Sequence, residues 1–458
     1  MKVPANIFRQ YDIRGVVDED LDAQIAHAIG RAVATMAFRR VGHAATIAVG
    51  RDNRPSGEML AHAVRDGIAA AGGTAIDVGQ VPTPALYLAL YELDDVDGGI
   101  QVTGSHNPPE FNGFKMVVDG DTLYGDDIQT LREMIEKDET DVGAGTLAAD
   151  DTVLDRYRRA IVSRNGPLER PIKVVVDCGN GVMSLVAVDT LTELGADVVP
   201  LYCESDGTFP NHHPDPTVPE YITELRAAVP RDKADLGIAF DGDGDRIGVV
   251  DETGQLIYGD RILALFGRDL ADRMGPDHTV IFDVKCSDVL PLDLEQHGLK
   301  PLMWKTGHSL IKVKMRELEA PLAGEMSGHM FFGGDYYGFD DALFAAARLL
   351  AYLARVNRPL AAILGDLPDR ASTPELRVDC PDDRKFAVVE AAAKHFASLY
   401  DVSTLDGVRI AFPEGWGLLR ASNTQPVLVM RFEAASEETV AANRHEVEEW
   451  LRTHGVSI

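Results

Sequence analysis

One serine in the first third of the chain lies in an unusual turn. The stretch TGSHNPPEFNGFK, residues 103–115, places Ser105 between a glycine and a histidine, and Asn-Pro-Pro holds the next turn. A serine hydroxyl is a weak nucleophile without a base or a positive environment, and the stretch lacks the GxSxG motif of α/β-hydrolases. We therefore expect a phosphorylated Ser105, with His106 and Lys115 steadying the phosphoryl group. A polar surface loop is the alternative.

Three aspartates form a second chemical feature, in the stretch ADLGIAFDGDGDRIGVVDETG. Asp241, Asp243 and Asp245 alternate with glycines, and carboxylates about 4 Å apart repel one another by roughly 1 to 4 kcal/mol per pair. A divalent cation removes this repulsion, and oxygen ligands suit Mg²⁺ or Ca²⁺. Arg246 follows directly, with a fork of donors that suits phosphate. We therefore expect a metal site that the phosphate on Ser105 completes.

Two alternatives to this metal site arise from the same stretch. In an EF-hand that begins at Asp241, Glu252 would fall at position twelve, but Arg246 occupies position six, where the calcium loop needs glycine. Apolar strands flank the aspartates, whereas helices flank an EF-hand. A solvated acidic turn is the second alternative, and the adjacent guanidinium argues against it.

Two further motifs suit a phosphorylated sugar. In GEMSGH, residues 324–329, Glu325 and Ser327 could bond vicinal sugar hydroxyls and His329 could move a proton, and a loop with an incidental glutamate is the alternative. RASNTQP, residues 420–426, precedes an apolar strand and offers donors for a phosphate that does not react. An ordinary turn would not require its arginine. These donors are Arg420, Ser422, Asn423 and Thr424, and weaker candidates are Tyr11 and Arg14 in YDIRG and His308 in KTGHS.

Three similar segments must position these loops. Each has an apolar strand, a helical run, a glycine-containing turn and a second strand: TIAVGRDNR to TAIDVG, IKVVVDCGNG to ADVVPLY, and TVIFDVKCSD to LKPLMWKTG. Apolar strands that alternate with helices predict βαβ units in a mixed or parallel sheet covered on both faces. Ligands in such folds meet the loops at the carboxyl ends of strands, where GRDNR, DCGNG and DVKCSD fall.

The last part of the chain follows another pattern. LDGVRIAF, the turn PEGW, GLLRASNTQPVLVMRFEA and a closing amphipathic run predict a hairpin-rich sheet with a terminal helix. A chain of 458 residues is too long for one core. We therefore predict an α/β protein with three related mixed-sheet domains of the βαβ type and a smaller C-terminal α+β domain. The predicted domains are residues 1–150, 151–253, 254–367 and 368–458.

The composition limits the classes of partner. A formal net charge of −29 argues against nucleic acid, because binding its phosphate backbone requires surplus lysine and arginine. The N-terminus shows no apolar signal segment, and the longest apolar stretch, ALFAAARLLAYLA, is too short to span a bilayer. We expect a cytoplasmic protein that binds neither nucleic acid nor membrane. Cysteines without CxxC or metal-type spacing predict buried thiols in a reducing compartment: Cys178, Cys203, Cys286 and Cys380.

In this order along one chain, TGSHNP, DGDGDR, GEMSGH and RASNT resemble the motifs of the α-D-phosphohexomutase superfamily. The resemblance spans essentially the whole chain, includes YDIRG and DVKC, and is greatest to the bacterial bifunctional phosphomannomutase/phosphoglucomutase branch. It implies a central cleft to which each of the four domains contributes one loop. It also implies reversible phosphoryl transfer between the 1 and 6 positions of mannose and glucose phosphates, through phosphoserine at Ser105 and a 1,6-bisphosphosugar.

The resemblance also implies roles for single residues. Mg²⁺ would lie on the three aspartates, Glu325 and Ser327 would select the sugar, and the RASNT donors would bind the distal phosphate. His329 would be a general base. Glucose 1,6-bisphosphate or mannose 1,6-bisphosphate would act as activator, the partners would be hexose phosphates, and a monomer would suffice. The cleft would be lined by Tyr11, Arg14, Lys115, Arg246, Lys285, His308 and His329; Lys285 and the role of His308 come from the resemblance alone.

Three alternatives stand beside this function. Met326 and Gly104 favour a hexose enzyme over a phosphoglucosamine mutase, for which the resemblance implies GEQSGH and an alanine before the serine. Gln425 departs from the threonine or glutamate often found at its position. A phosphosugar phosphatase would use the same serine and aspartates, whereas a catalytically silent sugar-phosphate-binding protein would need no phosphorylatable serine.

Overall fold

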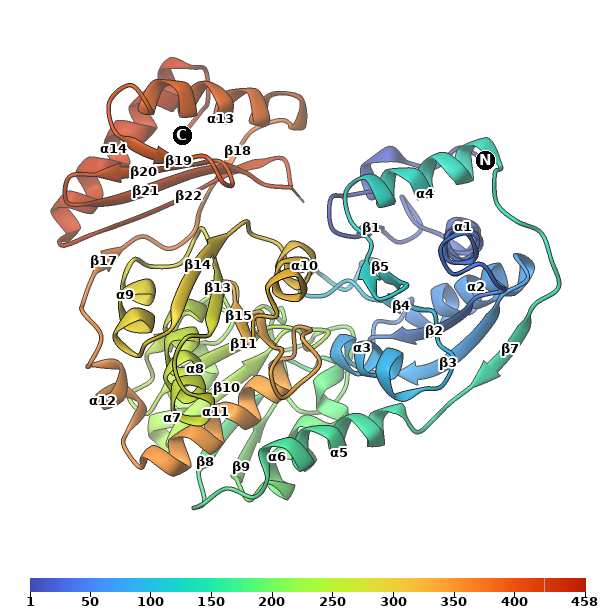
Figure 1. The fold of residues 1–458 in the computed structure, drawn as a ribbon, viewed down its shortest axis with the longest axis horizontal. Helices are drawn as coiled ribbons and strands as arrows, with labels where there is room; N and C mark the ends of the chain where they lie inside the picture. Colours follow the sequence, from blue (N-terminus) through green and yellow to red (C-terminus); the bar gives the residue numbers. More distant parts are fainter. Residues whose placement is uncertain (424) are drawn as a thin grey trace.

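The first domain contains a mixed sheet (Figure 1). The structure is a computed structural model that describes residues 1–423 and 425–458. The strand order is β1-β5-β4-β2-β3-β7, with β6 paired to β5. β2 runs parallel to β3 and β4, whereas β5 is antiparallel to β1 and β4. The strands are β1 (Ile13–Val16), β2 (Thr46–Arg51), β3 (Thr74–Gln80), β4 (Gly98–Val102), β5 (Phe111–Val118), β6 (Asp121–Thr122) and β7 (Thr146–Ala149). The helices are η1 (Ala5–Ile7), α1 (Ala23–Val41), α2 (Gly57–Ala70), α3 (Thr83–Glu92) and α4 (Asp126–Lys137).

The second domain carries the aspartates at the end of a buried strand. Its sheet order is β12-β11-β10-β8-β9, in which β8 is parallel to β9 and β10, and β10 and β11 form an antiparallel hairpin. Strands therefore flank residues 241–246, and the EF-hand alternative is wrong. The strands are β8 (Lys173–Asp177), β9 (Asp197–Leu201), β10 (Leu236–Phe240), β11 (Ile247–Asp251) and β12 (Leu256–Ile257). The helices are α5 (Val153–Asn165), η2 (Val182–Leu185), α6 (Ala187–Glu193) and α7 (Thr223–Asp232).

The third domain repeats the pattern with a smaller sheet. The order is β14-β13-β15-β16, with β13 parallel to β14 and β15, and β15 antiparallel to β16. The GEMSGH turn joins β15 to β16. The strands are β13 (Thr279–Asp283), β14 (Lys300–Trp304), β15 (Leu322–Gly324) and β16 (Met330–Phe332). The helices are α8 (Gly259–Met274), α9 (Val289–Gln296), α10 (His308–Leu318), α11 (Ala342–Val356) and α12 (Leu360–Leu364).

The fourth domain has an antiparallel sheet covered by two helices. The order is β17-β22-β21-β20-β19, with β18 paired to β22. The strands are β17 (Ala371–Ser372), β18 (Leu376–Asp379), β19 (Asp401–Ser403), β20 (Val408–Phe412), β21 (Gly415–Ala421) and β22 (Val427–Ala434). The helices are α13 (Asp382–Phe396) and α14 (Glu437–Thr453).

The predicted architecture is confirmed. β2–α2–β3, β8–α6–β9 and β13–α9–β14 each join two parallel strands through a helix, and the C-terminal unit is α+β. The domain boundaries at residues 150, 253 and 367 stay predictions. The second sheet extends past residue 253, because β12 pairs with β11.

The molecule contains several hydrophobic cores. One extends from β2 through the second and third domains to Leu367, a second lies within the first domain and a third within the fourth. A smaller cluster, in which Val284 packs with Trp416, joins the third and fourth domains. In Figure 1 the fourth domain (red) lies at the upper left, away from the first domain (blue) at the right. The stretch ALFAAARLLAYLA forms the buried helix α11, which Asp341 caps by accepting from Phe344 N at 2.8 Å. Within residues 1–423 and 425–458, no helix has the length and apolar character of a membrane span.

Candidate active site

The serine and aspartate motifs meet although 136 positions separate them in the sequence. Ser105 Oγ donates to Asp241 Oδ2 at 3.0 Å. Ser105 follows β4 and Asp241 follows β10, so both lie where buried strands end, the edge at which ligands bind in such sheets. Ser105 is 2% exposed and Asp241 is fully buried, so water is largely excluded between them.

This close approach requires glycine in the aspartate loop. A Cβ atom at Gly242 would lie 2.4 Å from the Ser105 backbone oxygen, closer than real contacts allow. Gly244 has a φ of +79°, a left-handed conformation that glycine adopts without strain. The glycines between the aspartates therefore allow loops of two domains to touch.

The three aspartates form a compact group of buried acids. One ligand oxygen from each lies within 4.8 Å of the others. Asp241 Oδ1 accepts from the backbone N–H groups of Gly244 and Asp245, both at 3.0 Å, and of Arg246 at 3.1 Å. Burial, together with the neighbouring charges of Asp245 and Asp243, raises the pKa of Asp241 well above its ordinary value.

Lys115 is the cation that balances these acids. Its Nζ donates to Asp243 Oδ2 at 2.7 Å and also contacts the Asp245 carboxylate. Burial alone would favour the neutral amine, but the two carboxylates outweigh it and raise the pKa of Lys115 well above its ordinary value. Burial likewise opposes ionisation of Asp243, and Lys115 overcomes it and lowers the Asp243 pKa. Thr83 Oγ1 adds a donor to Asp243 Oδ2 at 2.5 Å.

The group has two carboxylate oxygens to spare for a metal ion. Among the described residues, Asp243 Oδ1 and Asp245 Oδ1 are buried without a hydrogen-bond partner. A buried anionic oxygen without a partner costs free energy, which a divalent cation would recover. Carboxylate oxygens are also the ligands that Mg²⁺ prefers. The residues therefore fit a magnesium site.

His106 and Arg14 lie beside the serine. His106 Nδ1 is 3.2 Å from Ser105 Oγ. Burial and the cations Arg246 and Arg14 lower the pKa of His106 well below its ordinary value, so its ring is neutral at pH 7. Arg14 donates to Asn107 Oδ1 at 3.2 Å, so it fastens the turn that follows the serine.

Arg54, which was not among the predicted site residues, organises the serine turn. Its buried guanidinium donates to the backbone oxygens of Ser105 at 2.7 Å, Asn107 at 2.6 Å, Pro108 at 2.5 Å and Phe111 at 3.0 Å. Five N–H donors in a rigid fork suit this task, whereas lysine offers a single centre. Ser105 has a φ of +50°, which is unfavourable for a residue with a Cβ, so the surrounding contacts must hold it.

Asp52 completes this support from the same loop. It accepts from Arg54 Nε at 3.1 Å, from Thr103 Oγ1 at 2.7 Å and from Gly104 N at 3.2 Å. Thr103 Oγ1 in turn accepts from Ser105 N at 2.8 Å. Both residues belong to the motif GRDNR, which falls at the carboxyl end of a predicted strand. That position in the sequence could have identified them as site residues.

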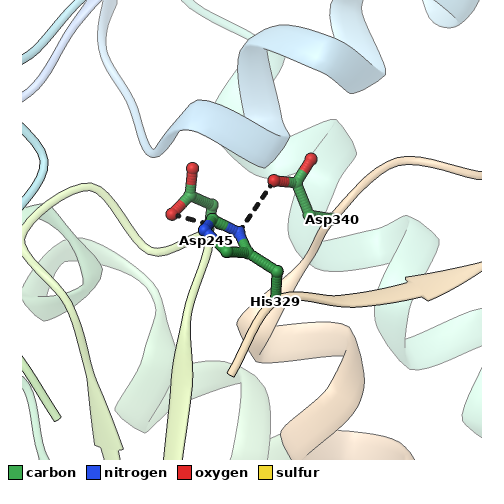
Figure 2. Close-up of side chains that lie close together, drawn as sticks. All are labelled: Asp245, His329 and Asp340. Atoms are coloured by element: carbon green, nitrogen blue, oxygen red, sulfur yellow. Dashed lines mark ion pairs between the residues drawn. The ribbon is translucent and has the colours of Figure 1, made fainter. Parts of the chain in front are cut away.

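His329 lies between two carboxylates, as Figure 2 shows. Its Nδ1 is 3.0 Å from Asp340 Oδ2 and 3.7 Å from Asp245 Oδ1. Its Nε2 accepts from Arg246 Nε at 2.9 Å, which places a ring proton on Nδ1, the nitrogen that faces Asp340. Lys312 Nζ donates to Asp340 Oδ1 at 3.0 Å and fixes that carboxylate. No sequence motif indicated Asp340 or Lys312.

A second polar group joins the first, third and fourth domains. Tyr11 Oη donates to Thr306 O at 2.9 Å and accepts from Asn423 Nδ2 at 2.7 Å. Gly307 N donates to Glu325 Oε1 at 2.7 Å. A Cβ at Gly307 would lie 2.7 Å from the Tyr11 ring, so the two loops meet through a glycine. His308 connects the groups, because its ring stacks on His329 with centroids 5.5 Å apart.

The remaining predicted residues lie around this second group. Arg420 is 6% exposed, and its Nε donates to Asp406 Oδ2 at 3.1 Å. Ser422 Oγ accepts from Gln425 N at 3.2 Å. Lys285 Nζ lies 3.2 Å from Glu375 Oε2, a contact between the third and fourth domains. Ser327 is half-buried in the turn that contains Glu325, and Thr424 lies outside the described residues.

Four family profiles match consecutive parts of the chain. Their descriptions read phosphoglucomutase/phosphomannomutase, alpha/beta/alpha domains I, II and III and C-terminal domain. They match residues 5–141, 155–254, 258–371 and 375–449. This succession on a matching fold defines the class of protein: an intramolecular phosphotransferase of the isomerase class that acts on hexose phosphates.

Individual proteins agree with the profiles. Phosphomannomutase/phosphoglucomutase of Pseudomonas aeruginosa is 50% identical over 95% of this chain and 93% of its own length. Phosphoglucomutase of Neisseria gonorrhoeae is 44% identical over 96% of this chain and 95% of its own. The chain therefore belongs to the phosphoglucomutase/phosphomannomutase family of the α-D-phosphohexomutase superfamily.

Solved structures show the same fold. A phosphoglucomutase/phosphomannomutase family protein from Burkholderia thailandensis superposes with a TM-score of 0.91 at 45% identity, covering 99% of each chain. At 16% identity, N-acetylphosphoglucosamine mutase of Aspergillus fumigatus, solved in complex with GlcNAc-6P and magnesium, shares the fold with a TM-score of 0.64. That match covers 97% of this chain and 96% of the other.

Proposed function

We propose that the protein interconverts the 1- and 6-phosphates of glucose and mannose through a phosphoserine at residue 105. The observation that carries this proposal is the 3.0 Å contact between Ser105 Oγ and the Asp241 carboxylate in a group of buried acids. A hydroxyl placed there has no use in a simple binding site. Phosphorylated, it would supply the acceptor oxygens that the group lacks for a metal ion.

Mg²⁺ would be held by Asp241, Asp243 and Asp245 together with the phosphate on Ser105. When bound, it would offset the negative charge on the transferring phosphoryl oxygens, the main form of catalysis in phosphoryl transfer. The protein's own cations lie at the same point, because Lys115 contacts Asp243 and Asp245, and Arg246 directly follows Asp245.

The first half-reaction moves the phosphoryl group from Ser105 to the free hydroxyl of the sugar phosphate. The O–P bond at Ser105 breaks, the O–P bond to the sugar forms, and Ser105 Oγ takes up a proton to become a hydroxyl again. The sugar hydroxyl must lose a proton, and we assign this task to His329. Its Nε2 becomes free to accept the proton once Arg246 turns to the incoming phosphate, and Asp340 then stabilises the imidazolium through Nδ1. His106 and Arg14 hold the serine turn while the group leaves.

The second group of residues would hold the rest of the substrate. Glu325 and Ser327 would bond sugar hydroxyls. Arg420 would leave Asp406 to pair with the phosphate that does not react, and a phosphate is a bidentate partner for a guanidinium. Tyr11, Lys285 and His308 would line the space between the two phosphate positions, and Ser422, Asn423 and Thr424 would add donors beside Arg420.

The product of this first transfer is a 1,6-bisphosphosugar. It must turn end over end so that its other phosphate returns to Ser105. Glucose 1,6-bisphosphate or mannose 1,6-bisphosphate would therefore activate the enzyme by phosphorylating the serine. The four domains supply every required group from one chain, so a monomer suffices.

A phosphorylation assay tests the proposal. After incubation with glucose 1,6-bisphosphate, the intact protein should gain about 80 Da, the mass of one phosphoryl group, with the modification mapped to Ser105. Later addition of glucose 6-phosphate should discharge it without release of inorganic phosphate. Labelling at another residue, or stoichiometric phosphate release, would reject the phosphoserine mutase and favour the phosphatase.

Phosphoglucosamine mutase is the second candidate, because a probable phosphoglucosamine mutase of Methanopyrus kandleri is 32% identical over 96% of this chain. Turnover on glucose 1-phosphate, mannose 1-phosphate and glucosamine 1-phosphate separates the candidates. Met326 leads us to expect the first two as the better substrates.

A further inference from the structure

Two thiols that are 25 positions apart in the sequence lie side by side in the second domain. Cys178 Sγ and Cys203 Sγ are 3.2 Å apart. Cys178 follows β8 in the DCGNG turn and Cys203 follows β9, and the register of these parallel strands pairs Asp177 with Leu201. Adjacent strands therefore deliver both cysteines to one edge of the sheet, in free thiol form.

The two thiols differ in access to solvent. Cys178 is fully buried, whereas Cys203 is half-buried, so the prediction that all the cysteines are buried is wrong for Cys203. The hydrogen bond between the two thiols lowers the pKa of Cys203, and the same bond, with burial, raises the pKa of Cys178 well above its ordinary value. Cys203 is thus the thiol that ionises first and that a small oxidant reaches first.

We propose that Cys178 and Cys203 form an oxidation site at which hydrogen peroxide closes a disulfide and slows the mutase. The Cys203 thiolate attacks one peroxide oxygen; the S–O bond forms, the O–O bond breaks, and the departing hydroxide takes a proton to become water. Cys178 then loses its proton and attacks Cys203 Sγ; the S–S bond forms and the hydroxyl leaves as a second water. Two thiols lose two electrons, and one peroxide gains them.

The geometry favours closure over further oxidation. A disulfide has an S–S length of about 2.05 Å, so the two sulfurs must approach by roughly 1.2 Å. Cys178 is already in contact with the sulfur that would carry the hydroxyl. A sulfenic acid at Cys203 therefore meets its resolving thiol before a second peroxide arrives. Cys286 and Cys380 lie in the third and fourth domains and are buried.

The turn after Cys178 reaches the aspartate loop. Gly181 N donates to Cys178 O at 2.7 Å, and the next residue, Val182, donates from its N to Gly242 O at 3.1 Å. A Cβ at Gly181 would lie 3.0 Å from the Gly242 oxygen, so the two turns are in contact. Packed interiors transmit such shifts, and a 1 Å misplacement at a reacting centre costs up to about 100-fold. We expect the closed disulfide to reduce kcat about 3- to 10-fold.

The experiment uses the full chain in its phosphorylated form. The protein is treated with hydrogen peroxide, quenched with catalase and analysed by mass spectrometry after alkylation. Trypsin leaves both cysteines on one peptide, residues 174–226, because no Lys or Arg lies between them, and a second cleavage at Glu193 separates them. We expect a loss of about 2 Da, two fragments joined after cleavage at Glu193, and a parallel fall in kcat that dithiothreitol reverses.

Matched variants give the controls. Cys203→Ser and Cys178→Ser should keep full turnover in peroxide, whereas Cys380→Ser should respond like the unaltered protein. Because a serine could disturb the buried position 178, Cys203→Ala serves as an independent variant at the more exposed position. The proposal is overturned if Cys203 gains oxygen atoms without joining Cys178, if both thiols remain open to alkylation, or if the disulfide forms and kcat stays the same. The first two outcomes are read from the thiols alone and do not depend on the phosphoserine mechanism, whereas the third is measured against the turnover of the untreated enzyme.

Discussion

The two polar groups of the site are built in different ways. Around Ser105, fully buried charges from the first and second domains contact one another repeatedly, and Arg54 holds the turn with four carbonyl contacts. Around Tyr11, single hydrogen bonds join loops of three domains, and the fourth domain has a separate core. The reacting end is thus assembled before substrate arrives, whereas the holding end depends on single hydrogen bonds between loops of different domains. Under the proposed function, this division suits a bisphosphate that must turn over without escaping.

The largest effect should come from Ser105→Ala. Loss of the phosphoryl acceptor should reduce kcat at least 1,000-fold, while the melting temperature stays within about 2 °C because a small side chain is removed. Mutase turnover is measured with bisphosphate supplied. Ser398→Ala, at an exposed serine of the fourth domain, is the control, and near-normal turnover of Ser105→Ala would eliminate the phosphoenzyme.

Asp243→Asn should affect the reacting end through the metal. The variant loses one anionic ligand and one of the two carboxylates that contact Lys115. Half-saturation by Mg²⁺ should therefore rise at least tenfold, whereas the KM for the sugar phosphate changes less than threefold. Asp206→Asn, at an exposed acid of the same domain, should leave both values unchanged. An unaltered magnesium titration would contradict the assigned site.

Arg54→Lys tests whether the serine turn needs its fork of donors. A lysine cannot hold four carbonyls, so Ser105 should lose its left-handed conformation part of the time. We expect kcat to fall about 10- to 100-fold with KM unchanged. Arg65→Lys, at a half-buried arginine paired with Asp77, is the matched control. If kcat and stability fell together, and to the same extent in both variants, Arg54 would support the fold in general and would have no special role in the serine turn.

Tyr11→Phe should weaken the holding end instead. It removes the hydroxyl shared by Thr306 and Asn423, so KM should rise about 3- to 10-fold with kcat within twofold. Burial raises the pKa of Tyr11 to about 12, so the effect should be constant from pH 6 to 9. Tyr91→Phe, at an exposed tyrosine, is the control. A large loss in kcat would show that Tyr11 also acts in the reaction, and the group around Tyr11 would then not differ in role from the group around Ser105.

The smallest effect should come from Glu375→Gln, between the third and fourth domains. Lys285, with Arg377, lowers the pKa of Glu375 to about 2, so the ionised carboxylate stabilises the folded state above its ordinary pKa of 4.5. That stability is lost as the pH falls from 4.5 to 2. The variant should be less stable than the unaltered protein by about 1 to 2 kcal/mol at pH 7, and the difference should vanish near pH 2.

Urea unfolding at several pH values measures this difference. Glu390→Gln, which removes an exposed pair with Lys394, should show no comparable pH dependence. A difference that persists at pH 2 would show that Glu375 acts through packing and not through its charge.

Local sequence patterns predicted the fold and the positions of the motifs, because strand ends in βαβ units fall at one edge of a sheet. They did not indicate Asp340, whose partners Lys312 and His329 come from other elements and share no motif with it. Nor did spacing reveal the contact of Cys178 with Cys203, because register between parallel strands decides it. Arg54 could have been predicted as a site residue, because its motif, GRDNR, falls at the carboxyl end of a predicted strand.

The hydrogen bond between Tyr11 and Asn423 joins residues 412 positions apart. During synthesis, the Ser105 and Asp241 loops can meet once the second domain has left the ribosome, long before residue 423 is made. A nascent chain would therefore possess its reactive serine while the other end of the site was still missing. Such an unfinished chain would have its serine and aspartate loops in contact, yet it would lack the residues to which the proposed function assigns the rest of the substrate.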